Sequence, residues 1–316
     1  MRALVTGAAG FIGSHLSAAL LDSGASVAGI DCFTDYYSRA IKEANLGNVK
    51  GRPGFSFVEA ALQDVDLPAL LTGVTHIFHL AGQAGVRKSW GGDFDVYIRD
   101  NIQATQRLLE AIARMPIQKY VYSSSSSVYG NHVPLPMRED TYLQPLSPYG
   151  VTKLAGEHLG NLYCANHGVP AVSLRYFTVY GPRQRPDMAF QRFLTAARDG
   201  TPITMYGDGE QTRDFTYIAN VVDGVLRACE SAQAAGEVIN VATGRRISLN
   251  ELLRVMNQIV GTRLEPIYLE ARVGDVRDSQ ADISKARALL GYEPAIGLEE
   301  GLQHTLDWCR SAGPIS

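Results

Sequence analysis

A glycine-rich turn near the start of the chain limits the folds that it can adopt. The apolar residues 2–6 read as a strand that runs directly into glycines at positions 7, 10 and 13, and a helical pattern follows. Glycines at this spacing let backbone amides at a helix start approach a pyrophosphate without obstruction from a Cβ atom. The turn therefore predicts a dinucleotide site formed by Gly7, Gly10, Phe11, Ile12 and Gly13.

Short apolar strands alternate with helical patterns through the first half of the chain. The expected strands are 2–6, 26–30, 55–58, 76–80, 119–122 and 171–175. Such alternation implies a parallel sheet with helices on both faces. We therefore predict an α/β fold built on a Rossmann-type doubly wound parallel sheet.

The second half has a different character, with frequent Gly and Pro after residues 181–182. A short strand is expected at 202–205, and helices at 219–230, 249–260 and 298–310. We expect a Rossmann domain over 1–177, to which segments near 215–245 return. Residues 178–316 are expected to form mainly a smaller α/β lobe that holds the substrate.

Composition excludes several classes of function. The 316 residues are 46% hydrophobic, which allows a substantial core, and the net charge of -3 gives no global reason to bind nucleic acid or an acidic membrane surface. No apolar run approaches membrane-spanning length. The four cysteines lack metal-ligand spacing, so neither a metal site nor disulfides are expected. The first strand leaves no room for a signal peptide, which favours a cytoplasmic location.

The expected cofactor is NAD. Asp31 ends the second predicted strand, where a carboxylate accepts from ribose hydroxyls and repels a 2′-phosphate. Leu80, Ala81 and Gln83 end the fourth strand beside the expected nicotinamide ribose, although a merely well-packed strand end would look similar. Rossmann-like domains that bind nothing are the alternative reading, and the strand, helix and acid around this turn argue against it.

A tyrosine and a lysine one helical turn apart predict proton transfer. Ser147 and Pro148 indicate a helix start, which puts Tyr149 and Lys153 on one face. A phenol titrates near pH 10 in water, and a neighbouring ammonium favours its ionised form, so Tyr149 is expected to take a hydroxyl proton. A chance surface pair is the alternative. The serines 123–127 argue against it, because they follow a predicted strand where parallel sheets place their ligands.

These features resemble the extended branch of the short-chain dehydrogenase/reductase superfamily, and within it the UDP-glucuronate 4-epimerase family. The resemblance covers essentially the whole chain and is carried by residues 31–37, 83–87, 123–130, 149–153, 178–190 and 208–217. It implies that Ser125 is the catalytic hydroxyl and Tyr149 the base. Lys153 is then the partner of the cofactor ribose and of the phenolate.

The same resemblance implies further contacts with the cofactor and the substrate. Arg213 and Arg272 would hold the diphosphate, and Asp275 the uridine ribose. The remaining implied contacts are Cys32, Ala61, Leu62 and Tyr176 for the cofactor and Arg87 for the substrate. Similar proteins usually carry an Asp where this chain has Ala61, so one adenine contact is lost, while Leu62 can still pack on adenine.

The residues after the catalytic serine favour epimerisation over elimination. Related 4,6-dehydratases carry an acidic pair where this chain has Ser126 and Ser127, and related decarboxylases carry a Glu there. Without a carboxyl group to act at C5 and C6, elimination is poorly supported. The expected reaction is reversible hydride transfer at C4, with rotation of the 4-keto sugar before the hydride returns to its opposite face.

An arginine-rich loop favours an acidic sugar. Arg185 is expected to bind a C6 carboxylate, with Arg192 as a further candidate and the hydroxyls of Ser126, Ser127 and Thr178 as a clamp. In the alternative interpretation these arginines serve the UDP phosphates or the exterior. The expected activity interconverts UDP-glucuronate and UDP-galacturonate. A 4-epimerase for UDP-glucose or UDP-N-acetylglucosamine, a UDP-glucuronate decarboxylase and a non-catalytic NAD-sensing regulator are the alternatives.

Two helices predicted near 95–115 and 149–167 carry apolar residues on more than one face. Deep burial within one chain is one explanation, and the seam of a homodimer is the other. We favour the homodimer.

Overall fold

A seven-stranded, fully parallel sheet forms the centre of the computed structural model, which describes residues 1–271 and 274–312. Its strand order is β11-β6-β5-β4-β1-β2-β3, as expected for a doubly wound Rossmann-type sheet. The strands are β1 (Arg2–Thr6), β2 (Ser26–Asp31), β3 (Phe55–Glu59), β4 (His76–His79), β5 (Lys119–Ser125), β6 (Ala171–Tyr176) and β11 (Val238–Val241). The predicted α/β fold is confirmed.

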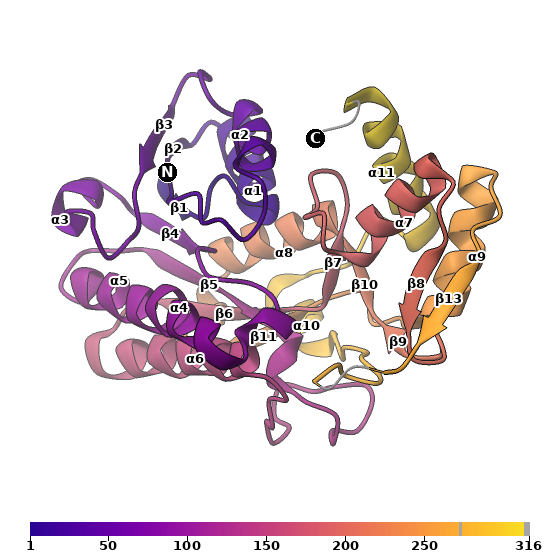
Figure 1. Ribbon diagram of the computed structural model, residues 1–316. Coiled ribbons are helices and arrows are strands. Elements are labelled where there is room, and N and C mark those ends of the chain that lie inside the picture. The colour runs from indigo at the N-terminus through magenta and orange to yellow at the C-terminus, as the bar shows by residue number, and fades with distance from the viewer. Residues whose placement is uncertain (272–273, 313–316) are drawn as a thin grey trace.

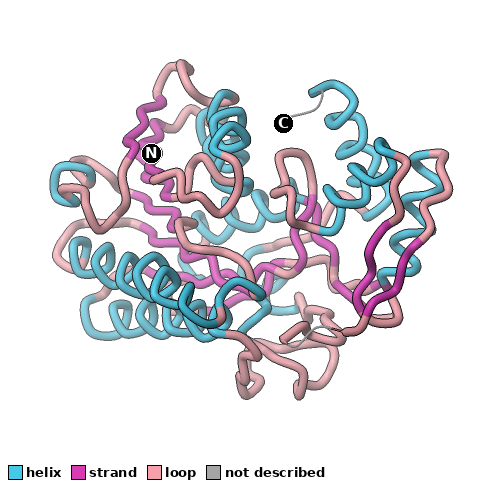
Figure 2. The backbone as a smooth tube through the Cα atoms, viewed as in Figure 1, coloured by secondary structure: helices cyan, strands magenta, loops and turns pink. Residues whose placement is uncertain are grey.

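Helices cover both faces of this sheet (Figures 1 and 2). One face carries α4 (Phe94–Tyr97), α5 (Ala104–Ile112) and α6 (Pro148–His167), with the short α3 (Leu67–Leu70) beside α5. The other carries α1 (Phe11–Asp22), α2 (Arg39–Gly47), α8 (Ile218–Glu230) and α10 (Ser284–Leu290). This arrangement explains why the strands read as nearly continuous apolar runs, since both of their faces are buried.

Side chains on β1 illustrate how the sheet separates two cores. Ala3 and Val5 belong to the apolar cluster shared with α1 and α8, whereas Leu4 belongs to the cluster shared with α5. Successive side chains of a strand point to opposite faces, so one five-residue strand contributes to both cores. The carboxyl ends of the central strands are thereby held at one edge of the sheet.

Helix α6 begins as the sequence predicts. The Ser147 hydroxyl accepts a hydrogen bond from the Gly150 amide at 3.1 Å, and Pro148 is the first helical residue. The helix ends at Gly168, whose φ of 69° is the left-handed conformation that glycine adopts without strain.

The helix predicted over 95–115 is instead three segments. A π-helical stretch, Ile98–Gln103, separates α4 from α5. Its wider winding buries Asp100 and Asn101, which are 8% and 1% exposed. Such π-helical insertions are frequent at functional sites, and no periodicity in the sequence reveals this one.

Beside the main sheet, the described residues form three two-stranded sheets, which are referred to below as the second lobe. β7 (Thr178–Tyr180) pairs with β10 (Phe215–Tyr217), β8 (Ile203–Tyr206) with β13 (Pro266–Leu269), and β9 (Thr212–Arg213) with β12 (Ile247–Ser248). The helices beside them are α7 (Ala189–Asp199), α9 (Leu249–Val260) and α11 (Leu298–Ala312) (Figure 1). Between β10 and β12 the chain returns to the first lobe, where α8 packs on α1 and β11 pairs with β6. No helix in the described ranges is long and apolar enough to cross a bilayer.

Two glycines of α6 offer a matched test of how closely this helix packs on the sheet. A Cβ atom on Gly156 would lie 2.1 Å from the hydroxyl of the buried Tyr122, whereas one on Gly160 would meet nothing closer than 3.8 Å. Because alanine favours a helix by about 1 kcal/mol over glycine, we expect Gly160→Ala to stabilise the protein slightly. Overpacking should make Gly156→Ala lower the free energy of unfolding by about 1–3 kcal/mol. Urea unfolding followed by circular dichroism measures both, and equal stabilities would contradict the close packing.

Candidate active site

A cleft of about 810 Å³ lies between the carboxyl edge of the main sheet and the second lobe. Every candidate site residue within the described ranges borders it. The cofactor candidates on its wall are Gly7, Gly10, Phe11, Ile12, Gly13, Asp31, Cys32, Ala61, Leu62, Leu80, Ala81, Gln83, Tyr149, Lys153 and Tyr176. The substrate candidates on its wall are Arg87, Ser125, Ser126, Ser127, Thr178, Arg185, Arg192, Arg213 and Asp275. Arg272 lies outside the described residues.

The glycine turn forms a cradle at one end of the cleft. Gly7 has a φ of 71°, and a Cβ atom there would lie 3.0 Å from the Ala81 amide nitrogen. A Cβ atom on Gly13 would lie 2.1 Å from the Gly7 carbonyl oxygen. Neither position has room for a side chain, so the amides at the start of α1 stay accessible, as a pyrophosphate requires.

Asp31 is fixed at the end of β2. Its carboxylate accepts hydrogen bonds from the amides of Ala9 at 3.2 Å and Phe33 at 2.9 Å. These contacts hold a negative charge beside the glycine cradle. This placement suits recognition of a ribose and disfavours a 2′-phosphate.

An additional carboxylate reaches the same end of the cleft. Ala61 and Leu62 line the wall, and Leu62 is buried. Next to them, Gln63 donates to the Asp100 side chain at 3.3 Å. Asp100 thus brings an acidic group to the region where similar proteins carry an Asp in place of Ala61. No local pattern in the sequence indicates this position of Asp100, which lies buried in the π-helical segment.

Lys153 lies beneath the end of β5. Its ammonium donates to the Ser123 carbonyl at 2.8 Å, and the residue is 6% exposed. Burial lowers the pKa of Lys153 to about 8, while the nearby charge of Glu157 acts in the opposite direction. At the strand end, the Ser125 hydroxyl accepts from the Ser127 amide at 3.2 Å and donates to the Ser127 hydroxyl at 3.1 Å.

The electrostatic surroundings of Tyr149 differ from the sequence expectation. Burial raises the pKa of the Tyr149 phenol, and a hydrogen bond with Ser125 and the charge of Arg185 act to lower it. The cation that favours the phenolate is therefore Arg185. The Lys153 ammonium is instead directed at the Ser123 carbonyl, because a buried carbonyl needs a donor. The ring of Tyr97 packs edge-on against Tyr149, with centroids 6.3 Å apart.

A hydrogen-bonded chain connects the end of β4 with the start of α6. The Asn101 side chain accepts from the Gln83 amide at 2.6 Å and donates to the Thr152 hydroxyl at 2.9 Å. That hydroxyl donates in turn to the Tyr149 carbonyl at 2.8 Å. The segment after β4 and the start of α6 are thus connected through one buried amide. Asn101 was not predicted as a site residue, because it lies in the π-helical segment, which has no signature in the sequence.

Arg185 lies against an acid and an aromatic ring. Its Nε and Nη2 atoms bind the Asp187 carboxylate at 2.9 and 3.0 Å. Its guanidinium also lies 5.3 Å from the ring centroid of Tyr36, over which the Lys88 ammonium is placed at 4.7 Å. Tyr36 borders the cleft and was not predicted as a site residue. The aromatic pair that follows Asp31 in the sequence was the available signal.

At the far end of the cleft, backbone contacts hold Arg213 in place. Its Nη1 atom donates to the carbonyls of Thr212 at 2.8 Å and Arg277 at 3.1 Å. Burial lowers the pKa of Arg213, and the charge of Asp275 opposes this effect. Asp275 also binds Arg87 at 2.9 Å, so the two cationic groups share one anionic neighbour.

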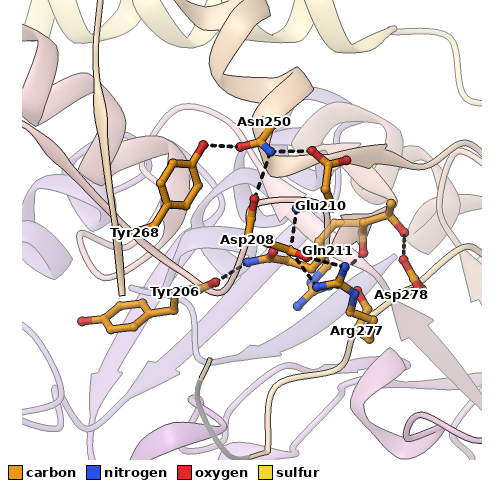
Figure 3. A network of polar contacts seen from close by, with 10 residues as sticks. Tyr206, Asp208, Glu210, Gln211, Asn250, Tyr268, Arg277 and Asp278 are labelled. Atoms are coloured by element: carbon orange, nitrogen blue, oxygen red, sulfur yellow. Dashed lines mark hydrogen bonds and ion pairs between the residues drawn. The ribbon is translucent and has the colours of Figure 1, made fainter. Parts of the chain in front are cut away.

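A polar network stabilises the turn beside Arg213 (Figure 3). Arg277 binds both oxygens of Asp208 at 2.7 and 3.0 Å. Asn250 donates to the carbonyl of Asp208 at 3.1 Å and to the carboxylate of Glu210, and it accepts from the Tyr268 hydroxyl at 3.0 Å. Three segments that are distant in sequence thereby hold the turn 206–213, from which Arg213 borders the cleft.

The comparisons with known proteins agree with this arrangement. The model of the NAD dependent epimerase/dehydratase family matches residues 3–242. The chain belongs to this family. An uncharacterised UDP-glucose epimerase of Bacillus subtilis, YtcB, is 45% identical to it, with 98% of each chain covered. A UDP-glucuronate 4-epimerase of Thermodesulfobacterium geofontis is 38% identical, with 97% of this chain and 95% of that protein covered.

A solved structure is similar over the whole chain. The UDP-glucuronic acid 4-epimerase of Bacillus cereus, in complex with UDP-glucuronic acid and NAD, has a TM-score of 0.96 and 43% identity, with 99% of this chain and 100% of that chain covered. Membership of the NAD-dependent epimerase/dehydratase family confirms the expected resemblance, the epimerase class of enzyme and NAD as the cofactor.

Proposed function

We propose that this enzyme is a UDP-glucuronate 4-epimerase, which interconverts UDP-glucuronate and UDP-galacturonate. The observation that carries the proposal is the lining of one cleft: Tyr149, Ser125 and Arg185 border it together, and serines at positions 126 and 127 replace the acids that elimination would require. Relatives with this activity cover nearly the whole chain at 38% and 43% identity.

In the proposed mechanism Tyr149 removes the proton from the 4-hydroxyl group of the sugar. Ser125 shares a hydrogen bond with the phenol and is placed to hold the same sugar oxygen. NAD, held by the glycine cradle, Asp31 and Lys153, supplies the reversible acceptance of a hydride. The same groups return the proton after the 4-keto sugar has rotated, so epimerisation involves no net oxidation.

The sugar carboxylate has to be kept from leaving as carbon dioxide, because a 4-keto glucuronate is a β-keto acid. Ser126, Ser127 and Thr178 are proposed to hold the carboxylate close to the plane of the carbonyl group, which disfavours cleavage. Arg185 and, on α7, Arg192 are proposed to supply the positive charge that binds the carboxylate. Arg213 and Arg272 are proposed to hold the diphosphate and Asp275 the uridine ribose, with Arg87 as a further substrate contact.

A 4-epimerase for neutral UDP-hexoses is the second candidate function. The Bacillus subtilis relative that is named a UDP-glucose epimerase has 45% identity, which favours this alternative. A decarboxylase is less well supported because residues 126 and 127 are serines. The presence of both Tyr149 and Lys153 argues against a non-catalytic NAD-sensing regulator.

The decisive assay incubates the protein with UDP-glucuronate, without added reductant, and follows the anomeric protons by NMR. We expect UDP-galacturonate to appear.

Tyr149→Phe should reduce turnover by at least about a thousandfold while NAD binding persists, because the base is lost without a change in shape. A UDP-pentose product would support the decarboxylase, and unchanged turnover of the variant would refute the role of Tyr149.

Arg185 provides a test of the carboxylate assignment. Arg185→Ala should lower kcat/KM for UDP-glucuronate roughly tenfold more than for UDP-glucose, since a charge-assisted hydrogen bond is worth about 1.5–3 kcal/mol. Arg185→Lys is the matched control, because it keeps the charge that acts on Tyr149 and loses the planar fork. Equal losses on the two sugars would remove the carboxylate role.

The division into lobes is also a proposal. We propose a cofactor domain over 1–177, completed by residues near 215–245, and a substrate lobe formed mainly by the rest of 178–316. The pairing of β11 with β6 and the contact of α8 with α1 support this division. The proposed compartment is the cytoplasm, which suits the free thiols of Cys32, Cys164 and Cys229. Detection of the protein outside the cytoplasmic fraction of lysed cells would contradict it.

We further propose a homodimer through the helices near 95–115 and 149–167. On α6, Val151 and Leu162 are 49% and 56% exposed, and Ala155 and His158 lie between them on the same stripe. Changing Val151 and Leu162 to Asp should convert a dimer into a monomer in light scattering. Tyr142→Asp is the control, since Tyr142 is 80% exposed outside these helices. A wild-type mass of one chain would contradict the dimer.

A further inference from the structure

Ser124 borders the cleft, but its hydroxyl is directed at helix α6. Ser123 and Ser125 contact groups of the reaction site, whereas the hydroxyl of Ser124 donates to the carboxylate of Glu157 on α6. This follows from the alternation of side chains along β5. The carboxyl end of β5 is thus held by Glu157, which does not line the cleft.

Glu157 belongs to a buried ion pair. Both of its oxygens bind Arg175 of β6, with Nε at 2.9 Å and Nη2 at 2.8 Å, and both side chains are 3% exposed. The Arg175 guanidinium also lies 4.7 Å from the ring centroid of Tyr129 and donates to the Glu139 carbonyl at 3.4 Å. The pair is therefore well satisfied, as a buried pair must be if it is to persist.

The ion pair lies between the elements that carry the proposed reaction residues. Arg175 is opposite Ser124 in the register of β5 and β6, and Glu157 is one helical turn beyond Lys153. The three elements that carry Ser125, Tyr149 and Tyr176 are thus connected at one point. Stability alone does not account for an ion pair here, because well-packed apolar residues often serve as well or better.

We propose that Glu157, held by Arg175, is a positioning residue: it fixes Ser124, and thereby the end of β5, against α6, and it places a negative charge one turn from the Lys153 ammonium. The inference rests on the proposed roles of Ser125, Tyr149 and Lys153. It assigns to the buried pair a part in the reaction in addition to packing.

The groups around the Lys153 ammonium determine how much the charge of Glu157 affects its pKa. Tyr149 shares its helix, the ring of Tyr122 from β5 lies 5.2 Å from its ammonium, and His79 of β4 is neutral because burial lowers its pKa to about 3. Among the described residues, Glu157 is the anion that raises the pKa of Lys153 against the effect of burial. Removing this charge lowers that pKa further, so the ammonium is lost at a lower pH.

The variant Glu157→Gln tests the charge with little change of shape. We expect the pKa of Lys153, followed by NMR of lysine labelled with ¹³C at Cε and assigned with Lys153→Arg, to fall by roughly half a unit to one unit. The alkaline limb of kcat should move to lower pH by the same amount, with KM nearly unchanged. An unchanged Lys153 titration would overturn the electrostatic part of the proposal, and this readout does not depend on which sugar is the substrate.

Ser124→Ala tests the mechanical part. It removes only the hydrogen bond between the strand end and Glu157, so we expect kcat to fall roughly three- to tenfold, the loss of one hydrogen bond of about 1 kcal/mol, without a shift of the alkaline limb. An unchanged kcat would overturn this part.

A double variant tests the ion pair if Glu157→Gln alone folds poorly. It combines Glu157→Gln with Arg175→Met and so removes both charges together. If kcat and the pKa of Lys153 in the double variant equal the wild-type values, the ion pair has only a packing role.

Discussion

The close approach of helix α6 to strand β5 determines the rest of the active site. Gly156 leaves room for the Tyr122 hydroxyl at a distance that no Cβ atom would tolerate. Because of this contact, residues from two distant parts of the sequence form one group, with the Lys153 ammonium on the Ser123 carbonyl and the Tyr149 phenol beside Ser125. The glycine therefore contributes to the arrangement of the cleft together with the polar residues.

Two cations act at different places in the cleft. The buried Lys153 is directed at the end of β5, where it is placed to bind a ribose, while Arg185 from the second lobe acts on the phenol. A residue outside the main sheet thus lowers the pKa of a phenol that is carried by α6. Its own partner, Asp187, lies on the same loop, so movement of that loop would change the acidity of Tyr149.

Much of this arrangement was predictable from local patterns. The apolar runs identified the strands, the Ser147 and Pro148 pair identified the start of α6, and every candidate residue in the described ranges borders the cleft. The parts that were missed depend on geometry that no local pattern encodes. Asn101 and Asp100 turn inward because of a π-helical winding, and Tyr36 reaches Arg185 across a loop whose direction only the tertiary structure sets.

The return of β11 to the main sheet has a consequence for how the protein can be divided. β11 covers the edge of β6, although it follows β6 by more than sixty residues, roughly the length of a small domain. A fragment truncated after β6 would expose the backbone of that strand, and an uncovered edge invites pairing with other chains and aggregation. The main sheet is thus completed by a segment that lies far along the chain, so a fragment that ends after β6 is not suited to expression by itself.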